Sequence, residues 1–117
     1  MKRLYSAAAN TMRGLTLAAK SEAAFREEIV LLLAALPLGV FLAPGIGWYV
    51  AMIGALFLVM AVELLNTAIE KLADHITPEW NAQIGMIKDM GSAAVFCALC
   101  VAGLVWLAAL AVRIGWF

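Results

Sequence analysis

The sequence predicts an all-α integral membrane protein, in which an N-terminal amphipathic surface helix precedes three transmembrane helices. Of the 117 residues, 66% are hydrophobic and 14% are charged, and the mean hydropathy is +0.99. A soluble domain of this length could not bury so much apolar surface, so lipid must cover the remainder. In addition, no charged side chain occurs from Ile29 to Val62 or from Met90 to Val112.

The first element is the surface helix, expected over residues 1–27. Apolar and small residues recur there at roughly helical spacing, with basic residues between them. They are Leu4, Ala7, Ala8, Thr11, Leu15, Ala18 and Phe25. This pattern is typical of an amphipathic helix that lies on a membrane surface. No repeat or linker interrupts the sequence, so residues 1–117 are expected to form a single domain.

Two spans follow within the first charge-free run. As one helix, Ile29 to Val62 would reach about 50 Å, well beyond a hydrocarbon core of about 30 Å. The run must therefore reverse, and Pro44 with Gly45 and Gly47 supplies the turn. The first span is expected over residues 29–43, where Pro37 can kink it. The second is expected over residues 48–70, with a cytoplasmic extension to about residue 76.

The third span is expected over residues 88–113. Small residues recur along it at helical spacing, and such stripes let membrane helices approach closely. They are Gly91, Ala94, Ala98 and Ala102.

The basic residues give the orientation. Five lie before the first span and two lie between the second and third: Lys2, Arg3, Arg13, Lys20 and Arg26, then Lys71 and Lys88. The turn between the first two spans has none. The positive-inside rule therefore predicts a cytoplasmic N-terminus and a cytoplasmic second loop.

Several function classes are disfavoured. The net charge of zero argues against a nucleic-acid partner. Cys97 and Cys100 lie in an apolar run without further ligands, so we expect small, buried apolar residues and no redox or zinc pair. His75 is the only histidine and is expected to be an ordinary interfacial residue.

The candidate chemistry lies at the end of the second span. On a helix, Glu63, Asn66, Glu70 and Asp74 project from one face. An ionisable group that follows directly on a long apolar run is costly, and by default it marks a functional site. An alternative is that these acids pair with basic side chains from neighbouring segments and only hold helices together.

Carboxylates with few cations nearby favour a bound divalent cation, and magnesium prefers such oxygen ligands. Phosphoryl transfer needs this metal, a positive group on the phosphates and a group that receives or orients the attacking hydroxyl. Lys88, beside Asp89, can supply the positive charge. Glu63 can meet a hydroxyl that arrives from lipid. On the residues alone this chemistry stays one option among several, since no P-loop or protein-kinase motif occurs.

Three segments together resemble the prokaryotic diacylglycerol kinase family: residues 22–28 (EAAFREE), 62–70 (VELLNTAIE) and 88–95 (KDMGSAAV). The resemblance covers nearly the whole chain. It implies a homotrimeric bundle with active sites shared between subunits, in a bacterial inner membrane. It also implies transfer of the γ-phosphate of MgATP to diacylglycerol at the cytoplasmic face.

The resemblance also implies residue roles. Glu63 corresponds to the catalytic base, with Asn66, Lys88 and Asp89 as further catalytic residues, and Glu22 and Glu70 correspond to the magnesium ligands. The implied ATP-binding residues are Arg3, Asn10, Glu22, Glu70, Glu79, Trp80, Asn81, Lys88 and Asp89. The implied lipid-binding residues are Arg3, Ala24, Glu28, Glu63 and Ser92.

Two positions depart from the family pattern. Asn10 stands where an aromatic residue is frequent, and Met86 stands where a basic residue is common.

Other functions remain open at this point. A related branch phosphorylates undecaprenol, although residues 90–94 look more like the diacylglycerol branch. A small proton-coupled transporter could use Glu63 as its relay, but this would leave Lys88 and Asp89 unexplained. A purely structural assembly protein would leave the acids unexplained.

Overall fold

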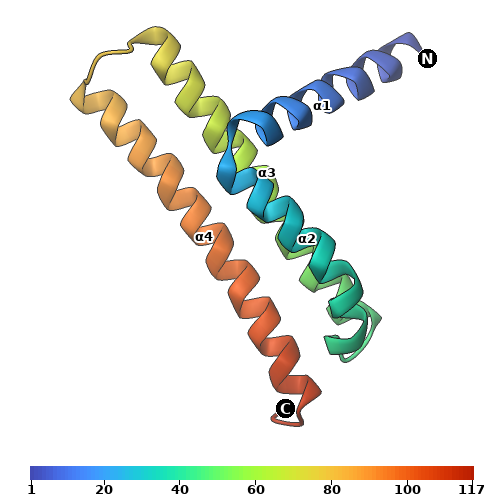
Figure 1. The fold of residues 1–117 in the computed structure, drawn as a ribbon. Coiled ribbons are helices and arrows are strands. Elements are labelled where there is room, and N and C mark those ends of the chain that lie inside the picture. The colour runs from blue at the N-terminus through green and yellow to red at the C-terminus, as the bar shows by residue number, and fades with distance from the viewer.

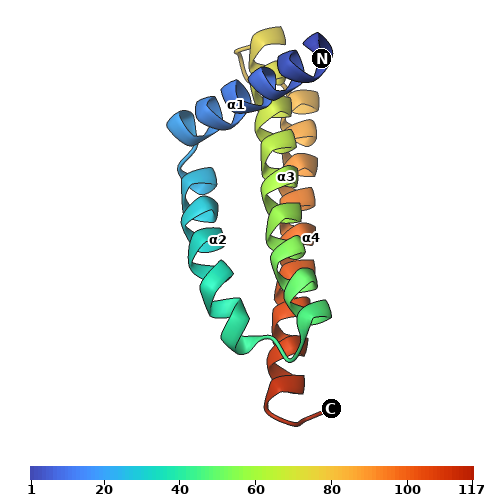
Figure 2. The same cartoon turned by 90° about the vertical axis from the view of Figure 1, so that its right-hand side faces the viewer.

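The chain is described over residues 1–117 by a computed structural model, and it forms four helices: α1 (Lys2–Ser21), α2 (Ala23–Leu42), α3 (Ile46–Ile76) and α4 (Ala82–Arg113). Helices α3 and α4 run antiparallel as a long hairpin, and α2 lies along α3 (Figure 1). Helix α1 turns away from this bundle at the end of the hairpin that carries the α3–α4 connection (Figures 1 and 2).

Helices α3 and α4 are both long and apolar enough to cross a membrane. They contain 31 and 32 residues, and their most apolar stretches have mean hydropathies of 2.1 and 2.6. Only 22% and 17% of these stretches are buried inside the chain, whereas the core helix of a soluble protein is mostly buried. At 1.5 Å per residue each helix is about 47 Å long, which is more than the thickness of the hydrocarbon core.

Helix α2 has a shorter apolar part. Arg26, Glu27 and Glu28 lie in its first two turns, and the uncharged part that follows reaches only from Ile29 to Leu42. That part is about 21 Å long, less than a bilayer core of about 30 Å. The structure therefore gives two helices of spanning length, and α2 stays a predicted third span.

The reversal between α2 and α3 occurs at Ala43–Gly45, as the proline and glycines predict. Pro37 lies inside α2 without ending it. Close to the reversal, the Tyr49 hydroxyl of α3 donates to the Leu36 carbonyl of α2 at 2.9 Å. The Tyr49 ring packs on Gly39, where a Cβ would come within 3.0 Å of it. Absence of a side chain at residue 39 therefore lets α2 and α3 meet closely.

The core consists of two small clusters, and only 16 of the 117 residues are buried within the chain. One cluster joins α1, α2 and α3 through Ala18, Phe25, Leu32, Ala35, Ile53 and Met60. The other joins α3 and α4 through Ala55, Val59, Ala98 and Ala102. The last two residues belong to the predicted small-residue stripe, whose role in helix packing is confirmed there. The Trp106 indole also links the hairpin by donating to the Met52 carbonyl at 3.0 Å.

Cys97 and Cys100 are free thiols on the exposed face of α4. The expectation that they are buried is therefore wrong for the single chain. They face outward because the side of α4 that contacts α3 is occupied by the smaller alanines.

The N-terminal segment differs from the expected helix over residues 1–27. It is divided at Glu22, whose backbone is extended (φ −121°, ψ 113°). The Arg26 guanidinium donates to the carbonyls of Ala19 and Lys20 at 2.9 and 3.2 Å, which satisfies the last turn of α1. Phe25 is only 1% exposed and anchors the start of α2.

Helix α4 begins at Ala82, before the span predicted to start at residue 88. Asn81 is its N-cap, because Oδ1 accepts from the amides of Gln83 and Ile84 at 2.9 and 3.3 Å. The helix therefore starts outside the apolar stretch, in the α3–α4 connection.

Candidate functional site

Four glutamates gather where α1, α2 and α3 meet, and we call Glu22, Glu28, Glu63 and Glu70 the carboxylate group. The negative charges of Glu70 and Glu22 act on Glu63, and the charge of Glu63 acts in turn on Glu28. Two of these residues come from α3, one from α2 and one from the α1–α2 elbow. The fold thus concentrates negative charge on a small part of the bundle.

Glu28 lies directly before the apolar part of α2. Burial, followed by repulsion from Glu63 and then Glu27, raises its pKa from 4.5 to about 7. Its Oε1 is buried and has no hydrogen-bond partner. A buried polar atom without a partner can receive a donor from a ligand, such as a hydroxyl group.

Asn66 connects the carboxylate group to α4. It is 8% exposed, and its Nδ2 donates to Glu70 Oε1 at 3.1 Å. Its Oδ1 is buried without a hydrogen-bond partner and lies against Gly91 of α4, where a Cβ would collide with it. The glycine therefore makes room for Asn66, and Asn66 fixes one oxygen of Glu70.

Lys71 is the only cation in a salt bridge with the carboxylate group. Its Nζ lies 3.7 Å from Glu22 Oε1. The only other salt bridge of the chain joins Lys88 to Asp74, whereas Arg26 bonds backbone carbonyls. Pairing of acids with neighbouring cations thus occurs, but one lysine does not balance four carboxylates.

No three side chains of the histidine, cysteine, aspartate or glutamate type are close enough to hold a metal together. Magnesium usually keeps several waters and takes one or two carboxylates with substrate phosphates. The donor chemistry of Glu22 and Glu70 fits that demand, because both are carboxylates beside other acids and few cations.

A polar pocket of about 260 Å³ lies at the α3–α4 connection, and we call it the loop pocket. It is lined by Asp74, Thr77, Pro78, Glu79, Trp80, Asn81, Ile84, Gly85 and Lys88. The structure thus brings together four of the predicted nucleotide residues, namely Glu79, Trp80, Asn81 and Lys88. Asp89 does not line the pocket and is exposed on α4. The Asn81 side chain is already used as a helix cap.

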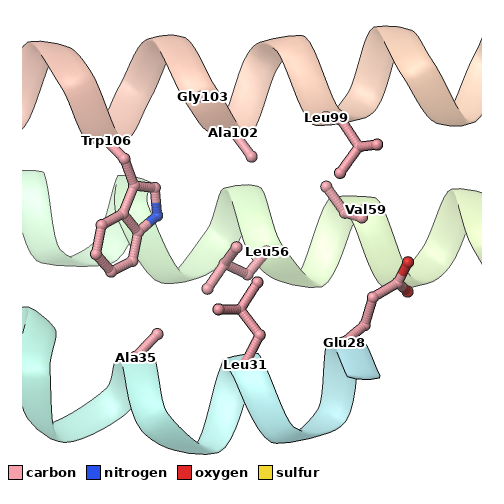
Figure 3. Close-up of a pocket in the computed structure, with 9 residues that line it drawn as sticks. All are labelled: Glu28, Leu31, Ala35, Leu56, Val59, Leu99, Ala102, Gly103 and Trp106. Carbon is pink, nitrogen blue, oxygen red and sulfur yellow. The ribbon is translucent and has the colours of Figure 1, made fainter. Parts of the chain in front are cut away.

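An apolar groove of about 290 Å³ runs between α2 and α4 with α3 as its floor. Its lining residues are Glu28, Leu31, Ala35, Leu56, Val59, Leu99, Ala102, Gly103 and Trp106. Figure 3 shows the Glu28 carboxylate at one end of the groove and the Trp106 ring at the other. The groove is therefore apolar except at one end, where Glu28 is the only charged residue of its lining.

Other predicted site residues lie apart. Arg3 and Asn10 are exposed on α1, which projects away from the α3–α4 connection (Figure 1). The Asn10 side chain accepts a hydrogen bond from Arg13. Ala24 and Ser92 are exposed on α2 and α4. One chain thus does not close a site that contains all the predicted residues.

The groove is what sequence reasoning missed, apart from Glu28. Its apolar lining residues, among them Leu31 and Leu56, have no local signal, because any membrane helix carries such side chains. Trp106 was the one available hint, since an indole in the middle of an apolar helix needs a hydrogen-bond acceptor.

Comparison with known proteins identifies the family of the chain. The sequence pattern of the family described as prokaryotic diacylglycerol kinase matches residues 9–110. A diacylglycerol kinase of Haemophilus influenzae is 45% identical over 96 residues, which cover 82% of this chain and 81% of the relative. Diacylglycerol kinases of Escherichia coli and Pseudomonas aeruginosa are 42% and 37% identical, and the matches cover 89% and 91% of this chain. They cover 85% and 86% of those relatives.

Proposed function

The chain belongs to the prokaryotic diacylglycerol kinase family and is therefore a lipid kinase of a bacterial membrane, and we propose that it transfers the γ-phosphate of ATP to diacylglycerol. The product of this reaction would be phosphatidic acid, released at the cytoplasmic face of the inner membrane. The observation that carries this proposal is that Glu28, a member of the carboxylate group, lies at one end of the apolar groove. A lipid has the same two parts, an apolar chain and a polar headgroup that carries the hydroxyl.

The groove offers a place for an acyl chain. Seven of its nine lining residues are hydrophobic, and they come from the charge-free parts of α2, α3 and α4. With the chain against Leu31 and Leu56, the headgroup would lie at Glu28, whose unpartnered Oε1 can accept from a hydroxyl. Ala24 and Ser92 would line the path of the headgroup from the bilayer.

Glu63 is the proposed base. Its charge acts on Glu28, at the end of the groove, and the charge of Glu70, the proposed metal ligand, acts on Glu63. A carboxylate near both can take the proton of a lipid hydroxyl while the hydroxyl oxygen attacks the γ-phosphorus, the bond to the bridging oxygen breaks and ADP leaves. Asn66 orients Glu70 through its 3.1 Å hydrogen bond.

Magnesium, when bound with ATP, would neutralise charge on the β- and γ-phosphates. Glu22 and Glu70 would hold it. Lys88 would contact the phosphates, with Asp89 beside it, and Glu79, Trp80 and Asn81 would line the nucleotide site in the loop pocket.

A homotrimer with shared sites would complete the arrangement. Helix α1, which carries Arg3 and Asn10, projects away from the α3–α4 connection of its own chain, so these residues can serve a neighbouring chain. Small membrane helices with exposed apolar faces also need partners or lipid to cover them.

Undecaprenol is the second candidate substrate, because it too joins an apolar chain to an alcohol. A proton-coupled transporter, by contrast, does not account for relatives that are diacylglycerol kinases.

Labelled-phosphate transfer from ATP tests the proposal. The full chain in mixed micelles is given diacylglycerol and undecaprenol in competition, with and without magnesium. We expect labelled phosphatidic acid to dominate and to require magnesium. Labelled undecaprenyl phosphate as the main product would reassign the substrate. Transfer at full rate without any divalent cation would refute the metal assignment.

A further inference from the structure

Lys88 and Asp74 form the shortest salt bridge of the chain. Lys88 Nζ lies 2.6 Å from Asp74 Oδ1, and the pair joins the C-terminal part of α3 to the N-terminal part of α4. Both residues line the loop pocket, together with Glu79 and Trp80. Lys88, the predicted phosphate-binding lysine, is thus paired with Asp74, which has no role in the proposed phosphate transfer.

Helix stability does not explain this partner. The side chains of Lys88 and Asp74 are 37% and 58% exposed, and exposed ion pairs add little to stability. In addition, Asp74 lies near the C-terminal end of α3, where the helix dipole disfavours a negative charge. The pair therefore calls for a role in the pocket itself.

We propose that Asp74 is a positioning residue, which holds the Lys88 ammonium in the loop pocket so that it meets the nucleotide phosphates already ordered. Free lysine side chains have many rotamers, and ordering one on binding lowers affinity. Asp74 accepts a hydrogen bond from one N–H of the Lys88 ammonium and leaves the other two N–H groups free to donate to phosphate oxygens. The proposal rests on the assignment of Lys88 to the phosphates.

The sign of the effect depends on Lys88. By itself a carboxylate in the pocket repels phosphates, so Asp74 can favour nucleotide binding only through the lysine that it holds. With Lys88 present, loss of Asp74 weakens binding. With Lys88 absent, loss of Asp74 leaves binding unchanged or strengthens it. A merely structural contact would weaken binding in both cases.

The experiment is a double-mutant cycle on the full chain in micelles. Binding of a non-hydrolysable MgATP analogue is measured for the unmodified chain, Asp74→Ala, Lys88→Ala and the double variant. We expect Asp74→Ala to raise the dissociation constant about fivefold, since part of the lysine entropy is then lost on binding. In the Lys88→Ala background the same change should not raise it. Asp74→Asn, which keeps the oxygen acceptor, should recover part of the affinity.

Kinetics supply a second reading. Asp74→Ala should raise KM for MgATP by a similar factor and change kcat by less than about twofold, because the lysine is still available once nucleotide is bound. His75→Ala is the matched control, since it alters the same turn of α3 at an exposed residue outside the loop pocket.

The outcomes separate the two assignments. If Lys88→Ala binds the analogue normally, the phosphate role of Lys88 fails, and the proposal fails with it. If Lys88→Ala weakens binding but Asp74→Ala does not, or weakens it equally without Lys88, only the role of Asp74 fails. Tighter binding by Asp74→Ala alone would mean that Asp74 competes with the phosphates, which also overturns the proposal.

Discussion

Gly91 of α4 lies so close to Asn66 of α3 that a Cβ at residue 91 would collide with Asn66 Oδ1. Asn66 in turn donates to Glu70 at 3.1 Å. Because Gly91 has no side chain, Asn66 can take the position from which it holds the Glu70 carboxylate.

Gly91→Ala is expected to disturb this arrangement. The new methyl group must push Asn66 aside, which costs about 1–3 kcal/mol of stability for overpacking. The displaced Asn66 releases Glu70, and we expect turnover to fall about tenfold or more, as small misplacements in an active site can do. Turnover and unfolding in micelles measure the two effects.

Gly54→Ala is the matched control for that variant. A methyl group at residue 54 would have no neighbouring atom within 4 Å, and alanine is the better helix former. Its turnover should stay normal. Equal losses in both variants would show that the contact with Asn66 has no special role.

Glu63→Gln should abolish most turnover while leaving nucleotide binding intact. Glutamine keeps the shape of the side chain but cannot take a proton, and loss of a general base typically lowers a rate about 10²- to 10⁴-fold. Phosphate transfer to diacylglycerol and binding of a MgATP analogue are measured on the same sample. Glu27→Gln, an exposed neighbour of the carboxylate group, controls for the loss of one negative charge. Normal turnover of Glu63→Gln would rule out the base.

Lys71→Met should lower the magnesium concentration that gives half-maximal turnover. Lys71 Nζ lies 3.7 Å from Glu22 Oε1, so the ammonium competes with a metal ion for that carboxylate. The pair is partly exposed and the expected change is modest, about two- to threefold. Lys20→Met removes an exposed charge close to Glu22 in the sequence without breaking a salt bridge. A higher magnesium requirement in Lys71→Met would contradict the competition.

Glu28→Gln should flatten the dependence of stability on pH. The pKa of Glu28 is raised from 4.5 to about 7, so the folded chain binds the proton more tightly than the unfolded chain. Its contribution to stability is complete below pH 4.5 and is lost as the pH rises to about 7. Denaturant unfolding at these two pH values compares the chains. A loss of stability with pH as large in Glu28→Gln as in the unmodified chain would place the titration elsewhere.

Particular residues show how far the sequence predicts this fold. Charge-free runs were enough for α3 and α4, and Pro44 with Gly45 was enough for the turn before α3. The elbow at Glu22 was not predictable in this way, because neither glycine nor proline marks it. It depends on Arg26, which reaches back to the carbonyls of Ala19 and Lys20, and on burial of Phe25.

The candidate site, too, is predictable from the sequence only in part. Helical spacing placed Glu63, Asn66 and Glu70 on one face of α3, because three residues on one helix depend only on its period. The partners across helices, Gly91 against Asn66 and Asp74 with Lys88, depend on how far α4 slides along α3. No local pattern encodes that register, so these contacts emerged only from the packed hairpin.

Because the chain buries so few of its own residues, the molecules around it supply most of the packing contacts of its side chains. Most of the large hydrophobic side chains are exposed on the single chain and contact the surrounding lipid or detergent. Exchanging lipid for detergent therefore replaces most of their neighbours at once, and a melting temperature measured for this chain describes the chain together with its solvent.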